Sequence, residues 1–387
     1  MNRNKFLVVS YSIPDRSTGT PVVVRKFLEN FQKDDLILIG RPTMKVERIQ
    51  GLKFEYPIVK IPTPPVSFRG EKLWRFLSIP MGIIIGMFLI KKYKLSSILA
   101  FYRDESSLLT GYLIHKITNL PFYTYFCDIY LENYSSGFYR KLAKWLQPRV
   151  FQSAKKIFVL TEGMQKYFQK NYDLEVITLP HCNNQDTQRT NRVESLVYPI
   201  KIGYLGSINV DRINSLRILC DSIMDDDRFF LTYFTSMTRD KLLNEGLLIN
   251  NSTIKRFLDD ELLLDELAKC DFLFLPVLLN SNAKERFQQI QTGFPTKAIE
   301  YLMCQKPIIL HSKKEFFVSN FFEKYNCGLL VEGGKEELSF ALHTLIDDKE
   351  LREKLSNNSL FALEYFNGKN VVSNFLDVIN DQNSNNR

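Results

Sequence analysis

Short, compact runs of apolar residues recur along the chain, and a helix-length segment separates each run from the next. The first run, at residues 5–10, is followed by a breaker-rich loop and a helical pattern over 22–31, with Pro21 near its first turn. Similar runs in the first half lie at 36–39, 97–101, 122–126 and 156–160. Buried strands that alternate with helices are typical of an α/β domain with a mostly parallel sheet.

A polar stretch over residues 183–198 interrupts this alternation, and we interpret it as an interdomain linker. The pattern restarts at 201–207, where a strand runs into a glycine turn. Later strands are expected at 229–234, 253–257, 272–276, 307–311 and 327–331. Residues 351–379 have a helical pattern, and 380–387 are expected to fray. The sequence therefore predicts a second α/β domain after the linker.

These observations place the predicted domain boundaries. We expect an N-terminal domain over 1–182 and a C-terminal domain over 199–368. A C-terminal helix with a frayed tail is expected over 369–387.

The segment 73–95 requires separate interpretation, because its centre, residues 79–90, is continuously apolar. This stretch is too short for a confident transmembrane helix, and Pro80 lies near its start. Basic residues flank it on both sides: Arg69, Lys72, Arg75, Lys91, Lys92 and Lys94. We favour a helix buried against the N-terminal sheet. The alternative is that the basic portion bearing Trp74 rests on an anionic membrane surface, and both can hold for different parts.

The composition is that of a soluble globular protein, with 387 residues, 45% of them hydrophobic. Six cysteines occur without a C-x-x-C pair, and the start of the sequence has no signal-peptide pattern. We therefore expect reduced cytosolic thiols. None of the four histidines has metal-ligand spacing, so we expect no zinc site.

Charge is distributed unevenly. Residues 1–180 contain 27 Lys and Arg against 14 Asp and Glu, whereas the remainder contains 24 against 29. A basic N-terminal half indicates an anionic partner, either nucleic acid or a membrane surface. No zinc-finger spacing, RNP-like motif or basic region with heptads occurs, so we expect no nucleic acid partner.

The segment 293–302 contains the most informative candidate chemistry. Pro295 fits the first turn of a helix, and Thr296 and Lys297 lie at the helix start, where free backbone N–H groups and the positive dipole end favour phosphate. Glu300 falls about one turn later and could accept hydrogen bonds from sugar hydroxyls. The alternative is an ordinary buried helix whose Glu300 caps or pairs locally, and spacing alone does not decide between the two.

Taken together, these features resemble the retaining nucleotide-sugar glycosyltransferases of the GT-B fold. The relevant branch is the group 1, family 4-like branch that builds bacterial lipopolysaccharide, capsule and exopolysaccharide. The elements that carry the resemblance are 202–207, 295–302 with Lys306-Pro307, and 156–161. The resemblance implies two doubly wound, Rossmann-like domains that face each other across a cleft. It also implies a final helix, near 371–379, that returns to the N-terminal domain.

The resemblance assigns donor binding to the C-terminal domain, at Gly206, Ser207, Arg212, Pro295, Thr296, Lys297 and Glu300. At Gly206 the missing Cβ would let the backbone approach the diphosphate. Arg212 and Lys297 are the implied catalytic cations, which would stabilise charge on the leaving diphosphate. Ser207 stands where many relatives have arginine, and Thr292 stands where many have glutamate. The identity of the donor sugar therefore stays open.

On the acceptor side the resemblance implies Gly19 and Thr20, in the loop beneath the cleft, together with Arg103 and Asp128. Asp128 follows a strand end, where such sheets bind ligands, and would orient or deprotonate the acceptor hydroxyl. The alternative is that Asp128 caps a helix.

The implied reaction is sugar transfer from a nucleotide diphosphate sugar to the hydroxyl of a lipid-linked saccharide or oligosaccharide. We expect retention, no bound metal and no cofactor. We also expect a cytoplasmic protein, with a peripheral position on the inner face of the plasma membrane. The alternatives are a noncatalytic subunit of the same fold, or a sugar-nucleotide epimerase.

Overall fold

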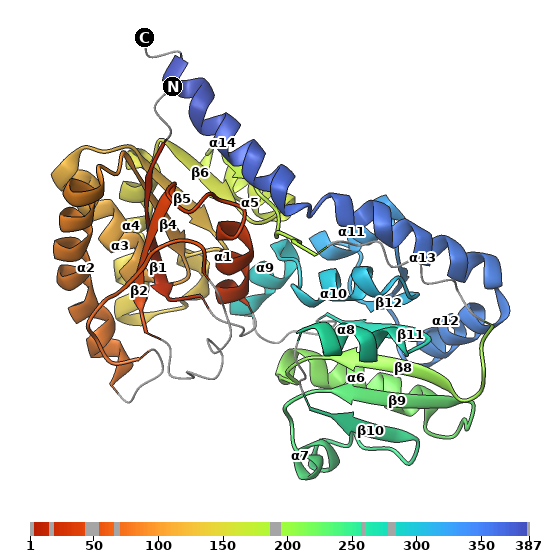
Figure 1. Ribbon diagram of the computed structural model, residues 1–387. Helices are drawn as coiled ribbons and strands as arrows, with labels where there is room; N and C mark the ends of the chain where they lie inside the picture. The colour runs from red at the N-terminus through yellow and green to blue at the C-terminus, as the bar shows by residue number, and fades with distance from the viewer. Residues whose placement is uncertain are drawn as a thin grey trace. The chain divides into compact units, whose positions relative to one another are not determined.

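The computed structural model describes residues 4–14, 19–42, 54–65, 70–185, 195–256, 260–277 and 284–384 (Figure 1). The chain divides into two units. Unit 1 comprises residues 1–184 and 366–387, and unit 2 comprises residues 185–365. Of the predicted linker over 183–198, residues 186–194 lie outside the described residues.

Unit 1 is built on a seven-stranded parallel sheet in the order β3-β2-β1-β4-β5-β6-β7. Its strands are β1 (Phe6–Ser12), β2 (Leu36–Arg41), β3 (Ile58–Lys60), β4 (Ser97–Tyr102), β5 (Phe122–Phe126), β6 (Lys156–Val159) and β7 (Ile177–Thr178). The central strands are buried along their length, which explains why their sequences are nearly continuous apolar runs. Strand order reverses beside β1, so the sheet is doubly wound.

Helices cover both faces of this sheet. They are α1 (Thr20–Leu28), α2 (Glu71–Tyr93), α3 (Glu105–Thr118), α4 (Gly137–Ser153), α5 (Glu162–Tyr172) and α14 (Gly368–Ser384), with a short 3₁₀ turn, η2 (Leu131–Asn133). Helices α1 and α14 pack on one face, where Phe27 and Phe375 contact each other with ring centroids 5.4 Å apart. On the other face, α3 packs between α2 and α4 (Figure 1).

The C-terminal helix α14 belongs to unit 1 and packs against α1. The Asn4 side chain donates a hydrogen bond of 3.1 Å to that of Asn380. At the start of α14, Asn183 pairs in parallel with Asn367. The helical pattern predicted over 351–379 is therefore interrupted near Asn367, and residues 380–384, expected to fray, continue the helix.

Unit 2 repeats the doubly wound arrangement with a six-stranded parallel sheet in the order β10-β9-β8-β11-β12-β13. Its strands are β8 (Ile200–Leu205), β9 (Phe229–Phe234), β10 (Ser252–Lys255), β11 (Phe272–Pro276), β12 (Ile308–His311) and β13 (Leu329–Val331). The switch in strand order lies beside β8, whose carboxyl end leads into Gly206. Ligands of doubly wound sheets bind at such a position.

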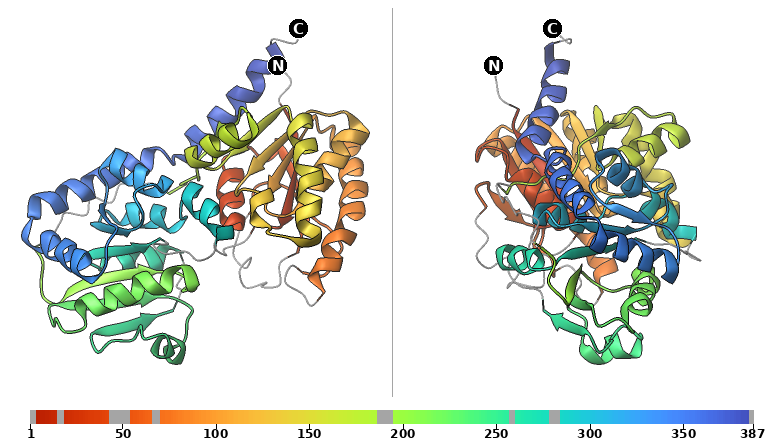
Figure 2. Two further views of the ribbon diagram at one scale, coloured as in Figure 1. Left: turned by 180° about the vertical axis from the view of Figure 1, so that it is seen from behind. Right: turned by 90° about the vertical axis from the view of Figure 1, so that its right-hand side faces the viewer.

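The helices of unit 2 also lie on both faces of its sheet (Figures 1 and 2). They are α6 (Val210–Ile223), α7 (Arg239–Asn244), α8 (Asp260–Ala268), α9 (Lys284–Thr292), α10 (Lys297–Cys304), α11 (Phe317–Tyr325), α12 (Lys335–Asp347) and α13 (Lys349–Glu364). Helix α6 packs against α12, whereas α10 packs between α8 and α13. The GT-B class expected from the sequence therefore matches the two parallel sheets of the structure.

Candidate functional site

The turn after β8 is shaped by Gly206. Its φ of +136° is a conformation that residues with a side chain rarely adopt. A Cβ at this position would overlap Nζ and Cε of Lys297 and lie 3.0 Å from its Cδ. The Gly206 N–H donates to the Phe234 carbonyl at 2.9 Å, so the turn is also attached to β9. Glycine is therefore required here because the Lys297 side chain occupies the space above it.

Helix α10 positions Lys297 as its first residue and places Glu300 in its first turn. Pro295 lies two residues before the helix, so its predicted placement in the first turn is wrong, whereas Thr296 and Lys297 do lie at the helix start. Its carbonyl accepts the Ala298 N–H at 2.9 Å, and the Thr296 carbonyl accepts the Ile299 N–H at 3.1 Å. The helix therefore opens with a tight turn, and Thr296 is its N-cap residue.

Lys297 is the electrostatically unusual residue of this site. Its side chain is 9% exposed, and its amino group has no hydrogen-bond partner among the described residues. Burial, reinforced by the nearby charge of Arg212 and partly offset by Glu300, lowers the pKa of Lys297 to about 7. A buried, unpartnered amine whose pKa is lowered in this way is typical of a functional site.

Arg212, on α6, reaches back to the glycine turn. Its guanidinium donates to the Ser207 carbonyl at 2.9 Å and lies 3.5 Å from the Ser207 hydroxyl. The Tyr204 hydroxyl donates to the same carbonyl at 2.9 Å, so two side chains hold this loop. The structure thus brings Gly206, Ser207, Arg212 and Lys297 together, as the resemblance implied.

Tyr301, next to Glu300 in sequence, has a positioning role that our sequence reasoning missed. Its buried hydroxyl accepts the Leu205 N–H at 2.7 Å and donates to the Phe274 carbonyl at 3.1 Å. One side chain therefore connects α10 to β8 and β11, the two strands at the switch point. The available signal was a hydroxyl in the segment 298–304, which is apolar apart from Glu300 and Tyr301.

Thr292 ends α9 and does not reproduce the carboxylate of many relatives. Its side chain is buried, and its hydroxyl donates to the Gln288 carbonyl at 2.8 Å. This bond to the preceding helical turn is common for threonine within helices. The residue therefore contributes hydrogen bonding to α9 itself.

The acceptor-side candidates lie near carboxyl ends of strands in unit 1. Gly19, with φ +85°, is the N-cap of α1, and Thr20 is the first helical residue. Arg103 follows β4 and is exposed. Asp128 follows β5, and its carboxylate accepts the N–H of the next residue, Ile129, at 2.9 Å. Asp128 is not the N-cap of the following turn η2, which is Tyr130.

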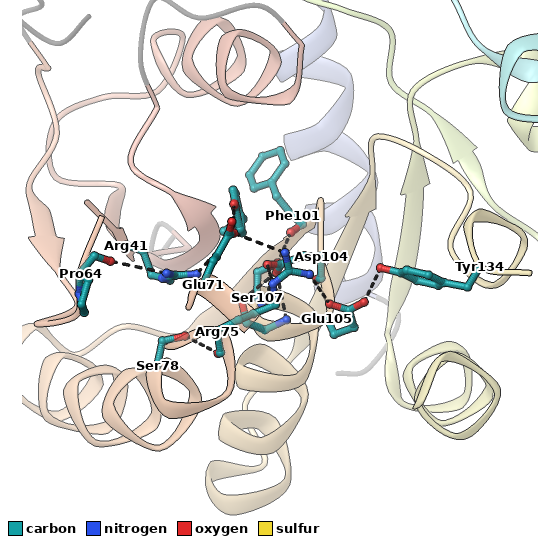
Figure 3. Close-up of polar contacts among 12 residues, drawn as sticks. Arg41, Pro64, Glu71, Arg75, Ser78, Phe101, Asp104, Glu105, Ser107 and Tyr134 are labelled. Atoms are coloured by element: carbon teal, nitrogen blue, oxygen red, sulfur yellow. Dashed lines mark hydrogen bonds and ion pairs between the residues drawn. The ribbon is translucent and has the colours of Figure 1, made fainter. Parts of the chain in front are cut away.

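A charged network occupies the same edge of the unit 1 sheet (Figure 3). Arg75, on α2, lies 3.4 Å from Asp104, 3.1 Å from Glu105 and 3.4 Å from Glu71. Glu71 accepts the Tyr11 hydroxyl at 2.6 Å, and Glu105 accepts the hydroxyl of Tyr134. The network connects α2 to the start of α3.

Within this network Asp104 has a structural role. Its carboxylate is the N-cap of α3 and accepts the N–H groups of Ser106 and Ser107 at 3.0 and 3.3 Å. Burial raises the pKa of Asp104 to about 6, although Arg75 opposes the shift. Asp104 and Glu105 are thus engaged by Arg75, whereas Arg103 is the exposed residue of this turn.

No group of three or more His, Cys, Asp or Glu side chains in the described part of the chain is arranged to hold a metal ion. The polar groups gathered at the end of β8 are instead cations with one nearby carboxylate. Such a set is suited to bind an anion that also carries hydroxyl groups.

Comparisons with known proteins agree with this geometry. Residues 238–360 match the family described as glycosyl transferases group 1. No curated protein matches the sequence. Sucrose-phosphate synthase from Thermosynechococcus elongatus is similar in structure, with a TM-score of 0.71 and 12% identity over 98% of this chain and 100% of that one. HepE from Anabaena, solved with UDP, has a TM-score of 0.71 and 13% identity over 97% and 100% of the two chains.

An epimerase is also structurally similar, but less so. A putative UDP-N-acetylglucosamine 2-epimerase from Listeria monocytogenes has a TM-score of 0.59 and 11% identity over 98% of this chain and 97% of that one. At such identities the likeness shows the fold alone, and that fold is GT-B.

Proposed function

We propose that this chain, a group 1 glycosyltransferase of the GT-B fold, transfers a sugar from a nucleotide diphosphate sugar to an acceptor hydroxyl. The observation that carries the donor class is the buried amine of Lys297, which packs on Gly206 without a hydrogen-bond partner among the described residues. A buried amine without a partner is costly, and a diphosphate would supply the missing acceptor. The UDP and UDP-glucose complexes of HepE support a nucleotide diphosphate sugar as donor.

In this proposal the residues of unit 2 act by electrostatic preorganisation. Arg212 and Lys297, with the start of α10, stabilise the negative charge that builds on the diphosphate as it leaves. Glu300 accepts hydrogen bonds from hydroxyl groups of the ribose. The chain's own cations then supply the charge stabilisation, so we propose transfer without an essential metal. Retention of the anomeric configuration is proposed from the resemblance of 202–207 and 295–302 alone.

The acceptor is proposed to be a lipid-linked saccharide used in bacterial lipopolysaccharide, capsule or exopolysaccharide synthesis. Asp128 and Arg103, near strand ends of unit 1, are the proposed contacts with it, and Asp128 would orient or deprotonate its hydroxyl. The basic N-terminal half, with 27 Lys and Arg against 14 Asp and Glu in residues 1–180, supports a cytoplasmic location at the inner membrane.

Donor binding is tested by the thermal stability of the purified protein with UDP and with UDP-glucose, since a ligand of the folded state raises the melting temperature. We expect an increase for the wild type that disappears in Lys297→Ala and Glu300→Gln. Lys306→Ala is the matched control, because Lys306 lies at the opposite, amino end of β12. Equal stabilisation of all four proteins would contradict the assignment of the site.

One observation favours a second candidate, a noncatalytic subunit of the same fold. Thr292 bonds to its own helix where many relatives have a carboxylate. Turnover distinguishes the two: acceptor-dependent release of UDP from UDP-glucose, lost in Lys297→Ala, excludes the noncatalytic subunit. Conversion of the donor to its epimer without any acceptor would instead favour an epimerase.

A further inference from the structure

One face of helix α2 is buried against the rest of unit 1. Gly82 and Gly86 allow close contact with α3, since a Cβ on them would lie 3.1 Å from Thr110 and 2.6 Å from Ile114. Ile79 and Leu89 are buried on the same face. The predicted burial of this segment is therefore confirmed for one side of the helix.

The opposite side of α2 is exposed and equally apolar. Leu73, Ile84 and Phe88 are 64%, 70% and 61% exposed. Residues three and four positions apart share one helix face, so the exposed apolar positions form a single stripe. We call it the outer α2 stripe: Leu73, Leu77, Pro80, Ile84, Met87 and Phe88. At 1.5 Å per residue it is about 22 Å long, and apolar surfaces of this extent mark interaction sites.

The charge around the outer α2 stripe is predominantly positive. Helices α2, α3 and α4 contain nine Lys and Arg but only two acidic residues, Glu71 and Glu105. Both acidic residues form ion pairs with Arg75. They therefore do not neutralise the exposed lysines and arginine on the outer surface of these helices. The exposed cations are Lys91, Lys92, Lys116, Lys141, Lys144 and Arg149.

The start of α4 adds aromatic residues beside the stripe. Phe138 is exposed and contacts Phe76 of α2, with ring centroids 5.5 Å apart. Further along α4, Trp145 is half-exposed, and the Arg149 guanidinium stacks on its ring at 4.7 Å. Aromatic and basic side chains together are typical of surfaces that contact lipid headgroups.

Length and composition alone would allow α2 to cross a membrane, since residues 73–93 pass that test. Crossing would require the glycine face to leave α3, would place Arg75 in hydrocarbon and would separate it from Asp104 and Glu105, which belong to the start of α3. A helix that keeps these contacts can lie only along a membrane.

We propose that the outer α2 stripe and its surrounding cations bind the surface of an anionic lipid bilayer, with α2 parallel to the membrane plane. The apolar stripe would enter the headgroup boundary while the lysines contact anionic headgroups. Its biological role rests on the proposed lipid-linked acceptor, because the surface would hold unit 1 where that acceptor is embedded. The sequence analysis gave membrane contact at the Trp74 portion only as the alternative to burial; the outer α2 stripe extends the proposed contact along the helix.

Co-sedimentation of the full chain with vesicles tests this proposal, using phosphatidylcholine alone and phosphatidylcholine with 30 mol% phosphatidylserine. We expect binding to the anionic vesicles only, weakened by added salt. The double variants Ile84→Ser/Phe88→Ser and Lys91→Glu/Lys92→Glu should each bind at least about tenfold more weakly. Equal binding to both vesicle types, or unchanged binding of the variants, would overturn the proposal.

Two matched controls come from unit 2. Phe340→Ser/Phe361→Ser removes two equally exposed phenylalanines, and Lys349→Glu/Lys354→Glu reverses two exposed charges. Both should bind vesicles like the wild type. The alternative partner for the outer α2 stripe is a second copy of the chain, and sedimentation equilibrium without lipid tests for it. A dimer that Ile84→Ser/Phe88→Ser dissociates, together with no binding to vesicles, would refute the membrane assignment.

Failure of this proposal can be distinguished from failure of the proposed function. The surface variants should retain stabilisation by UDP-glucose, and Lys297→Ala should lose it while still binding anionic vesicles. Vesicle binding without donor binding would support the proposed membrane-binding surface and contradict only the assignment of the donor site.

Discussion

The amino group of Lys297 occupies the place where a side chain at residue 206 would begin. A Cβ on Gly206 would overlap both Nζ and Cε of this lysine. The glycine turn after β8 and the first residue of α10 are therefore one structural unit, although 90 residues separate them in the sequence.

Gly206→Ala should reduce UDP affinity at least about tenfold, because the new methyl group would displace the Lys297 amine that we assign to the diphosphate. Isothermal titration calorimetry measures the change. Gly246→Ala is the matched control, since Gly246 also has a positive φ, +68°, but no atoms within 4 Å of an added Cβ. It should cost about 1 kcal/mol of stability through backbone strain and leave UDP affinity unchanged. Equal losses of affinity would show that strain alone is responsible.

The affinity for UDP-glucose should decrease as the pH rises above about 7. Lys297 has a pKa of about 7 in the free protein, so above this value binding of the anionic diphosphate must be accompanied by proton uptake. We expect a decrease approaching tenfold per pH unit between pH 7.5 and 9, and almost none below pH 6.5. Calorimetry in buffers of different ionisation enthalpy measures the proton directly. Lys297→Arg should give a flat profile; the same slope in Lys297→Met would refute this assignment.

Tyr301→Phe should lower both stability and donor affinity. Removing the hydroxyl leaves the buried Leu205 N–H and Phe274 carbonyl without this partner, at a cost of about 1–3 kcal/mol. The substitution also removes the connection of α10 to β8 and β11. UDP should therefore bind more weakly, although the buried Tyr301 is not itself one of the residues assigned to UDP. Tyr233→Phe is the control, since its buried hydroxyl donates to the Leu247 carbonyl at 2.6 Å elsewhere in unit 2. The control should lose stability and keep its affinity for UDP.

Arg75→Met should destabilise the protein by about 3–5 kcal/mol, because Asp104 and Glu105 would stay buried without a cation. Thermal unfolding at pH 7 measures the loss. Since burial already raises the pKa of Asp104 to about 6, the unfolded state releases this proton first as the pH rises through about 4 to 6. Ionised Asp104 therefore costs stability above pH 6. Removing Arg75, which lowers this pKa, raises the pKa of Asp104 further, so the deficit of Arg75→Met should shrink as the pH falls towards 6 and change no further through Asp104 below it.

The control for this prediction is Arg228→Met. Arg228 pairs with Asp226 at 2.7 Å, but this ion pair is at the surface. Surface pairs contribute about 0–1 kcal/mol, so the variant should unfold close to the wild type. Comparable losses in the two arginine variants would contradict the importance we give to burial.

The sequence predicted the interior of the fold better than its edges. The strands between 97 and 126 are buried on both faces, so their apolar runs are unambiguous. Strands β3 and β7 were missed because they are short edge strands of three and two residues that are not fully buried. The helical pattern read over 351–379 gave no sign of the break between α13 and α14, although a separate C-terminal helix was predicted from residue 369. The break coincides with the pairing of Asn183 with Asn367, a contact between distant parts of the chain.

The candidate site divides in the same way. Lys297 and Glu300 lie within one short helix, so their spacing placed them at one helix start, although it did not decide between a ligand site and an ordinary buried helix. The resemblance assigned Gly206 and Lys297 to one donor site, but their direct contact was not predicted, since local pattern carries no information on residues so far apart. Arg75 illustrates the limit: its carboxylate partners Asp104 and Glu105 lie some thirty positions away, and the sequence analysis did not connect them.

The return of α14 to unit 1 has a consequence for how the protein is made. Residues 366–387 belong to unit 1, and Phe375 packs in its core against Phe6, Phe27 and Phe158. The ribosome synthesises these residues only after all of unit 2. The N-terminal core therefore lacks the Phe375 side chain until the whole of unit 2 has been synthesised. The unit whose synthesis begins first cannot complete its core before the other unit has been made.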